Sequence, residues 1–122
     1  LRQYLGSIED PGLRADVFAR LFALTRAAGD AESAREAVAL VADTVRVAFL
    51  RLHVAKMTED VGDLRQAFAA LQAVYDPSFS LPVEIMLGKM PRQILVEALM
   101  TLDHRELREL VTQILRKRTH KV

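Results

Sequence analysis

The pattern of hydrophobic and polar positions repeats every three to four residues along most of the chain, and it is most extended in Ala31–Met57. This stretch has no Gly or Pro, and apolar side chains cover most of its helical circumference. A helix of this kind belongs in the middle of a bundle. At ~1.5 Å per residue it would be roughly 40 Å long, about the width of a domain of this size. We therefore predict a central helix with one narrow polar stripe, made of Glu32, Arg35, Asp43, Arg46 and His53.

Turn and capping residues divide the rest of the chain into shorter helices. Asp10 can cap a helix that begins at Pro11, because a carboxylate accepts from free backbone N–H groups and Pro tolerates the first helical position. The last helix begins with a capping-box pattern, in which Asp103 caps and Glu106 reaches back. The apolar periodicity predicts helices over Leu1–Ile8, Pro11–Ala28, Val61–Tyr75, Leu81–Leu87, Pro91–Leu102 and His104–Arg118.

A weak internal repeat offers an alternative for the central stretch. Helical repeats of the tetratricopeptide class have a period of about 34 residues. Under this alternative the stretch breaks near Asp43-Thr44 into two helices of a stacked hairpin array. The large apolar residues do not repeat and no third copy is evident, so one central helix remains our prediction. The repeat matches Gly29, Asp30, Ala34, Ala37 and Val41 with Gly62, Asp63, Ala67, Ala70 and Val74.

The composition favours an all-α fold. Apolar residues make up 51% of the 122 residues and aromatic residues only 6%, and many of the apolar residues are Ala, which favours helix. We predict a single domain over residues 1–122, an all-α bundle of about five to seven helices around Ala31–Met57 with shorter C-terminal helices. Because the chain begins with Leu1 rather than Met, we expect a piece of a longer protein.

Charge and cysteine content narrow the class of protein. The formal net charge is +1, and the absence of Cys excludes disulfides, thiolate zinc sites and cysteine nucleophiles. No charge-free stretch approaches the ~20 residues that a helix needs to cross a bilayer. We expect an intracellular, cytoplasmic protein without a membrane partner, and the nucleus is the alternative compartment.

No motif for catalysis, metal binding or cofactor binding is present. His53, His104 and His120 do not share a motif such as H-x-x-x-H or H-E-x-x-H. The Gly residues lie at separate helix boundaries, and no Ser lies in a nucleophile elbow. We therefore predict a protein that is not an enzyme and has no catalytic residue, cofactor or metal. A small helical enzyme is the third hypothesis, and it requires a pocket that brings His53 or His104 to a carboxylate from a distant helix.

The segment 79–90 is the first candidate for a binding surface. Its short helix has Val83, Ile85, Met86 and Leu87 nearly in succession, which is more apolar surface than one buried face can hide. Met also suits adaptable binding surfaces. The alternative is a plug that closes the core. We predict that a partner contacts Phe79, Leu81, Ile85, Met86 and Met90.

The basic C-terminal end is the second candidate. Residues 101–122 hold six Lys and Arg against three Asp and Glu. These cations can contact nucleic-acid phosphates or an acidic partner, or they can stabilise the end of the helix dipole by up to ~1 kcal/mol. The interleaved Glu residues and the lack of aromatic residues favour the interpretation that these cations stabilise the helix dipole. The basic residues are Arg105, Arg108, Arg116, Lys117, Arg118 and Lys121.

These observations favour binding over catalysis. We predict a non-catalytic helical protein–protein interaction module, an adaptor or regulatory domain whose partner is another protein. Self-association into a homo-oligomer is a further expectation. The alternative is a nucleic-acid-binding regulatory domain that uses the basic C-terminal helix and tail.

Overall fold

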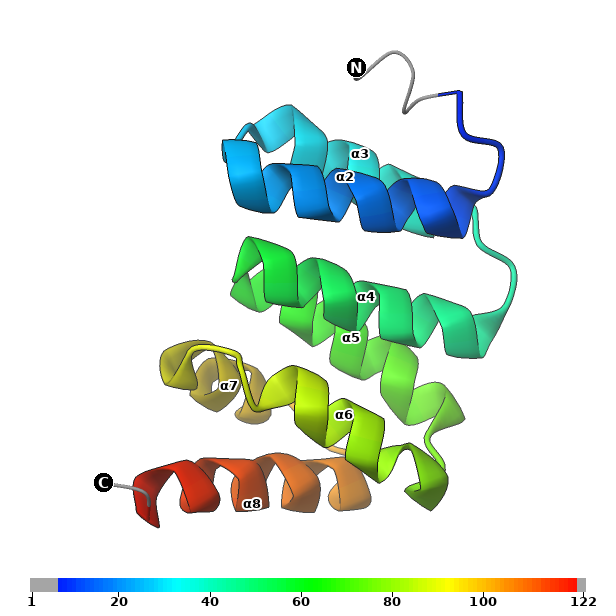
Figure 1. Ribbon diagram of the computed structural model, residues 1–122. Helices are drawn as coiled ribbons and strands as arrows, with labels where there is room; N and C mark the ends of the chain where they lie inside the picture. The colour runs from blue at the N-terminus through cyan, green and yellow to red at the C-terminus, as the bar shows by residue number, and fades with distance from the viewer. Residues whose placement is uncertain (1–6, 121–122) are drawn as a thin grey trace.

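The computed structural model describes residues 7–120, which form helices joined by short turns (Figure 1). This part of the chain contains no strand, so the predicted all-α class is confirmed, and its seven α-helices agree with the predicted five to seven. Most of the predicted helix over Leu1–Ile8 lies outside the described residues. The elements are α2 (Pro11–Thr25), α3 (Ala28–Val38), α4 (Thr44–Thr58), α5 (Val61–Val74), η1 (Pro77–Phe79, a 3₁₀ helix), α6 (Ser80–Leu87), α7 (Arg92–Leu99) and α8 (Arg105–His120).

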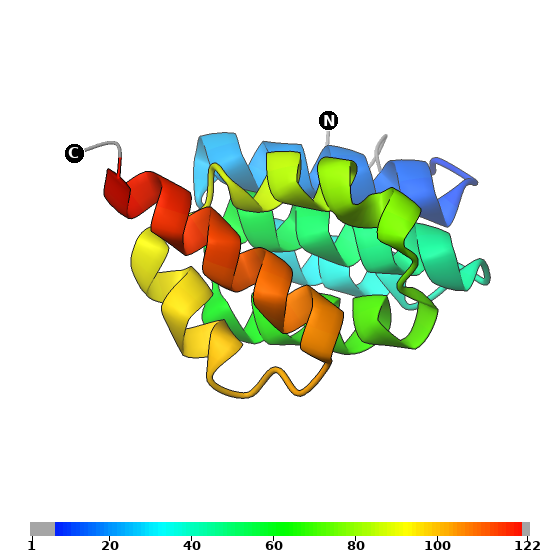
Figure 2. The same ribbon diagram turned by 90° about the horizontal axis from the view of Figure 1, so that it is seen from below.

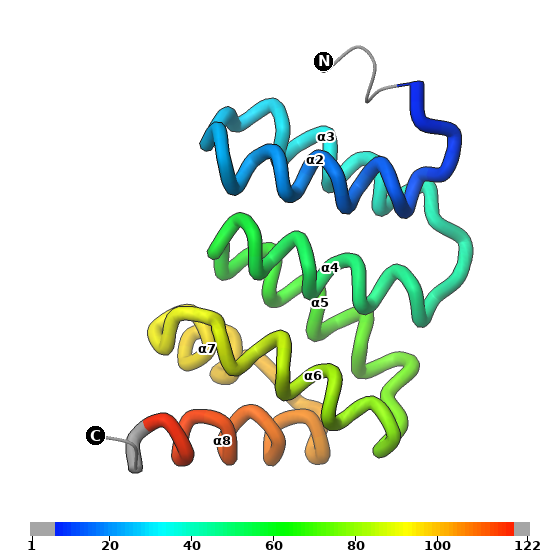
Figure 3. Tube along the Cα trace, in the orientation of Figure 1, coloured from blue at the N-terminus to red at the C-terminus, as the bar shows by residue number. Residues whose placement is uncertain are grey.

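The helices alternate between two layers. Helices α2, α4 and α6 form one layer and run in the same direction, whereas α3, α5 and α7 lie behind them (Figures 1 and 2). The Cα trace shows two antiparallel hairpins, α2–α3 and α4–α5, stacked on each other, with α6 continuing the front layer (Figure 3). Helix α8 packs against α6 and α7 at the end of the stack. The bundle is therefore a stack of hairpins.

The predicted single helix over Ala31–Met57 is wrong, and the alternative break near Asp43-Thr44 is correct. Helix α3 ends at Val38 and α4 begins at Thr44. The side chain of Asp43 accepts hydrogen bonds from the backbone N–H groups of residues 45 and 46, at 3.0 and 3.1 Å. This N-cap satisfies free donors at the start of α4, so the chain reverses there without a Gly or Pro.

The position of α4 explains why its sequence resembles a central helix. Val54 packs into a cluster with α2 and α3, whereas Leu52 packs into a second cluster with α5 to α8. Each fully buried side chain of this size contributes about 1.5–3 kcal/mol. Because α4 lies between two hydrophobic clusters, it is apolar on two sides. The apolar circumference of α4 therefore results from its position between two clusters and does not indicate a long helix.

The internal repeat is present in the structure as repeated helix starts. Asp10 accepts from the backbone N–H groups of Gly12 and Leu13, both at 3.3 Å, and so caps α2 as Asp43 caps α4. Asp76 caps η1 by accepting from the backbone N–H of residue 78 at 2.8 Å. Asp10, Asp43 and Asp76 are spaced at two equal intervals of 33 positions. A third start therefore exists, although the sequence pattern did not reveal it.

The turns between the helices of the first two hairpins are also equivalent. Thr25 Oγ1 donates to Asp30 Oδ2 at 2.7 Å, and Thr58 Oγ1 donates to Asp63 Oδ2 at 2.6 Å. The residue after each Thr ends its helix in the left-handed conformation, with φ of 57° and 53°. These two residues, Arg26 and Glu59, lie 33 positions apart. Arg26 Nη2 donates to Glu59 Oε1 at 3.5 Å. The hairpins are thus copies of one local design.

One Arg–Asp pair, which we call the rear ion pair, joins the two hairpins through α3 and α5. Arg35 Nε and Nη2 donate to the two carboxylate oxygens of Asp63, both at 2.8 Å. Burial alone would raise the pKa of Asp63, but the hydrogen bonds from Arg35 and Thr58 outweigh it and lower that pKa below 3.8. Hydrogen bonds to the ionised form have this effect because they stabilise the charge.

Candidate functional site

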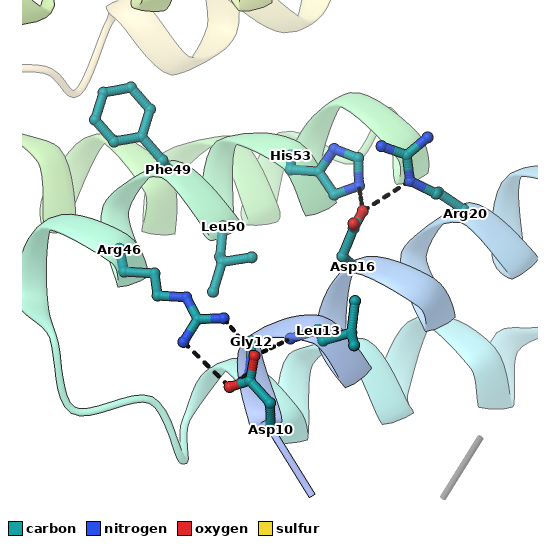
Figure 4. Close-up of a pocket in the computed structure, with 9 residues that line it drawn as sticks. All are labelled: Asp10, Gly12, Leu13, Asp16, Arg20, Arg46, Phe49, Leu50 and His53. Carbon is teal, nitrogen blue, oxygen red and sulfur yellow. Dashed lines mark hydrogen bonds and ion pairs between the residues drawn. The ribbon is translucent and has the colours of Figure 1, made fainter. Parts of the chain in front are cut away.

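A groove of about 450 Å³ lies between α2 and α4 on the front layer (Figure 4). Its floor is apolar, and an Arg–Asp pair lies at each end. Helix α2 supplies one wall and α4 the other, so the groove exists only because the hairpins stack in register. The lining residues are Asp10, Gly12, Leu13, Asp16, Arg20, Arg46, Phe49, Leu50 and His53.

The floor of the groove is formed by Leu13, Leu50 and Phe49. Leu13 is 49% exposed, which is high for a large apolar side chain. The ring of Phe49 packs edge-to-face on Phe79 of η1, with the ring centroids 5.6 Å apart. The floor therefore leads towards the start of α6, where the sequence predicts a partner surface.

At one end of the groove Arg46 forms a fork with Asp10. Arg46 Nη1 and Nη2 lie 3.1 and 2.7 Å from the two carboxylate oxygens. The hydrogen bond from Arg46 lowers the pKa of Asp10 below its ordinary value. A Cβ at Gly12 would lie 2.2 Å from Arg46 Nη2, so the missing side chain makes room for the guanidinium over the first turn of α2.

At the other end Asp16 faces two partners. Arg20 Nε donates to Asp16 Oδ1 at 2.8 Å, and His53 Nε2 lies 2.6 Å from the same oxygen. The His53 contact lacks the alignment of a hydrogen bond, and Nε2 is buried. Burial lowers the pKa of His53 below its ordinary value of 6.5, against the opposing effect of Asp16. Burial of the ring therefore favours the neutral form of the imidazole.

The structure thus assembles a histidine–carboxylate pair from two helices, as the enzyme hypothesis requires. The pair has little catalytic equipment around it, because the nine lining residues include no Ser, Thr or Cys that could act as a nucleophile. Asp16 is also shared with Arg20, and its contact with His53 is poorly aligned for orienting a general base.

The His104 side chain forms a helix cap and does not line the groove. Its Nδ1 accepts from the backbone N–H of Leu107 at 3.3 Å, so His104 caps α8. The predicted cap at Asp103 is therefore wrong by one residue. The His104 ring also packs on Tyr75, with centroids 5.5 Å apart. The side chain of His120 lies outside the described residues.

The predicted partner-binding residues of segment 79–90 are distributed between surface and core. Leu81 and Ile85 are 63% and 57% exposed, one helical turn apart on α6. Phe79 and Met86 are half-buried against the larger hydrophobic cluster, and Met90 is 1% exposed within it. The segment closes the core with one side and presents an apolar surface with the other, and contact of that surface with a partner stays a prediction.

Most of the basic residues of α8 contact the bundle. Arg108 Nη1 donates to the backbone carbonyls of residues 99 and 102, at 2.8 and 3.0 Å, and so closes the end of α7. Arg118 donates to the carbonyl of residue 90, and Lys117 pairs with Glu84 of α6 at 2.8 Å. Arg105 pairs with Glu109 of its own helix at 3.4 Å. Arg116 is exposed, and Lys121 lies outside the described residues.

The sequence analysis missed Asp10, Asp16, Arg20 and Arg46 as groove residues. The fork between Arg46 and Asp10 joins residues 36 positions apart, which is slightly more than one repeat. No local pattern reports such a contact. The interval of 33 residues is the signal that could have found it, because stacked repeats bring a residue close to the equivalent position of the next hairpin.

Comparisons extend neither the site nor the fold. Neither the protein-family models, the curated proteins nor the solved structures contain a match to this chain. Within residues 7–120 no group of three or more His, Asp or Glu side chains is placed to hold a metal ion. The helices of the same region are all too short or too polar to span a membrane.

Proposed function

We propose that this chain is a non-catalytic protein-interaction module that takes a segment of a partner protein into the groove between α2 and α4. The observation that carries this proposal is the groove itself, with an apolar floor and hydrogen-bonding side chains at both ends. Pockets that bind ligands combine an apolar lining with a few polar groups in this way.

The stacked hairpins support the proposal because α3 and α5 pack behind the two helices that form the groove. Helices α2 and α4 are each fixed by their own hairpin partner and by the buried clusters on both sides of α4. A partner can therefore bind without an ordering of the backbone. Preformed sites of this kind lose less conformational entropy on binding.

Leu13→Glu tests the proposal. Leu13 is half-exposed on the groove floor, so a charged side chain there changes the floor without entering the core. Random peptides displayed on phage are selected on the immobilised chain, and the affinity of each enriched peptide is measured for the wild type and the variant. We expect Leu13→Glu to weaken binding about tenfold or more, equivalent to the loss of one buried apolar contact of ~1.4 kcal/mol or more.

Leu24→Glu is the matched control. Leu24 lies on the same helix, is 84% exposed and does not line the groove. We expect this variant to bind the peptides as the wild type does, with both variants retaining the wild-type circular dichroism spectrum. Equal losses in the two variants, or a selection that enriches no peptide, would contradict the proposal.

A further inference from the structure

The two carboxylates of the groove differ in how far donors occupy their oxygens. Asp10 accepts from two nitrogens of Arg46 and from the backbone N–H groups of Gly12 and Leu13. The contacts of Asp16 with Arg20 Nε and His53 Nε2 are both made by Oδ1, and Oδ2 has no contact within the part of the chain that the structure describes. A carboxylate has about four acceptor positions, so Asp10 is saturated. The carboxylate at the Arg46 end of the groove therefore offers no free acceptor to a partner, and Asp16 Oδ2 is the free acceptor at the Arg20 end.

The guanidinium groups are not saturated. Arg20 uses only Nε, so both of its terminal nitrogens are without a partner among residues 7–120, and its side chain is 65% exposed. Each terminal nitrogen of Arg46 donates one hydrogen bond to Asp10, and Nε has no partner within the same residues. The Arg46 side chain is 46% exposed. Each guanidinium carries five N–H donors in a planar fork that matches a carboxylate.

The free donors lie on either side of the apolar floor. Figure 4 shows the guanidinium of Arg46 at one end, that of Arg20 at the other, and Leu13 and Leu50 between them. The formal charges of the two Arg–Asp pairs cancel, so complementarity here comes from unused hydrogen-bond donors and not from net charge. Two rings line the groove. Phe49 is packed on Phe79, and the His53 side chain is only 16% exposed, so neither gives an open platform for a nucleobase.

From these contacts we infer that the groove binds an acidic peptide segment, whose apolar side chain lies on Leu13 and Leu50 and whose flanking carboxylates accept from Arg20 and Arg46. This inference rests on the proposed function, because it names the chemistry of the segment that the same groove takes. The aliphatic side chain covers the exposed floor. The two carboxylates use donors that the protein itself leaves free.

A pair of matched peptide libraries tests the inference. Both consist of nonapeptides with a central Leu; the flanks of one draw on Asp, Glu, Ser and Gly, and those of the other draw on Asn, Gln, Ser and Gly. The affinities of the labelled wild-type chain for the immobilised peptides are compared at equal ionic strength. We expect the best acidic peptides to bind about tenfold more tightly than the best amide peptides, because charge-assisted hydrogen bonds are roughly twice as strong as neutral ones.

Arg20→Gln supplies the residue-specific test, and Arg26→Gln is its control. Arg26 is a similarly exposed Arg at the end of the same helix, but it does not line the groove. We expect Arg20→Gln to lower the affinity for acidic peptides about five- to tenfold and to leave the affinity for amide peptides unchanged. Arg26→Gln should bind both libraries as the wild type does.

The outcomes separate this inference from the proposed function. If displayed peptides bind through Leu13 but the amide library binds as well as the acidic one, the groove binds peptides and the inference is wrong. If no peptide of any kind binds, both proposals fail. If a single-stranded oligonucleotide or inorganic phosphate competes as well as an acidic peptide at equal charge, the donors form a general anion site and the inference is overturned.

Discussion

The two faces of the junction between the α2–α3 and α4–α5 hairpins use the same chemistry in opposite ways. Both faces are crossed by Arg–Asp pairs. At the rear the Asp63 side chain is 11% exposed, whereas at the front the Asp10 side chain is 46% exposed. Asp63 is enclosed by donors from α3 and from its own turn, and the front pairs border a groove.

The buried rear ion pair therefore fixes the junction between the hairpins, whereas the exposed front pairs leave the groove accessible. A charge removed from water must keep its partners, because a buried unpaired charge is costly. Exposed pairs between flexible side chains contribute little, typically below ~1 kcal/mol. The front pairs can therefore change partners at low cost, as the proposed binding of a peptide segment requires.

The largest effect is expected from Asp63→Ala. This variant leaves Arg35 and Thr58 without their common acceptor inside the junction. We expect a loss of about 2–3 kcal/mol in the free energy of unfolding, measured by urea denaturation. Asp16→Ala is the control at the front, with a loss below ~1 kcal/mol. Equal losses in the two variants would remove the distinction between the faces.

Acid should weaken the rear contact in the wild type. The pKa of folded Asp63 is lowered below 3.8, so its stabilisation is complete above the pKa of the unfolded chain. It is lost as the pH falls through the lower pKa of the folded state. We expect the unfolding free energy of Asp63→Ala to fall less steeply than that of the wild type below pH ~4. Parallel curves in this range would show that Asp63 does not contribute.

A smaller pH effect is expected from His53 at the front. Its folded pKa is lowered below 6.5 by burial, so the unfolded chain binds the proton first as the pH falls. The stability of the wild type should therefore decrease as the pH falls below ~6.5. The charged groups around the imidazole are Asp16 and Arg20 of α2 and Lys56 of α4. His53→Gln should remove this part of the slope, and an unchanged slope would assign it to other groups.

The smallest effect is expected from Gly12→Ala. The new Cβ would meet the flexible end of Arg46, so we expect the guanidinium to leave Asp10 and the backbone to stay in place. The lost exposed pair and the gain in helix propensity offset each other, so the free energy of unfolding should change by less than ~0.5 kcal/mol. Side-chain NMR of Arg46 would detect the movement. A loss above ~1.5 kcal/mol would mean that the fork is rigid.

Local physics determines most of the fold. N-cap chemistry predicted the start at Pro11 correctly, because a cap acts within one turn of the chain, and apolar periodicity predicted the start at Val61. The interruption between α3 and α4 was only the alternative prediction, because α4 is apolar on both sides for a non-local reason, its position between two hairpins. The reversal there is made by backbone hydrogen bonds of residues 39–41 and by the Asp43 cap, and no Gly or Pro marks it in the sequence.

The candidate site could not be predicted in the same way. The pair of His53 and Asp16 and the fork of Arg46 and Asp10 each join helices from different hairpins. Their contacts depend on how the hairpins stack, which no local pattern encodes. In the segment 79–90 the sequence correctly indicated excess apolar surface at Leu81 and Ile85, but periodicity alone did not separate them from Met90 in the core.

The Thr–Asp turns have a consequence for how this protein can vary through evolution. Each turn is built from its own hairpin, at Thr25 with Asp30 and at Thr58 with Asp63, and neither uses a residue that lines the groove. Mutations at Leu13 or Arg20 therefore leave the turns intact. Such a scaffold can accumulate changes in the groove while selection on foldability acts on other positions.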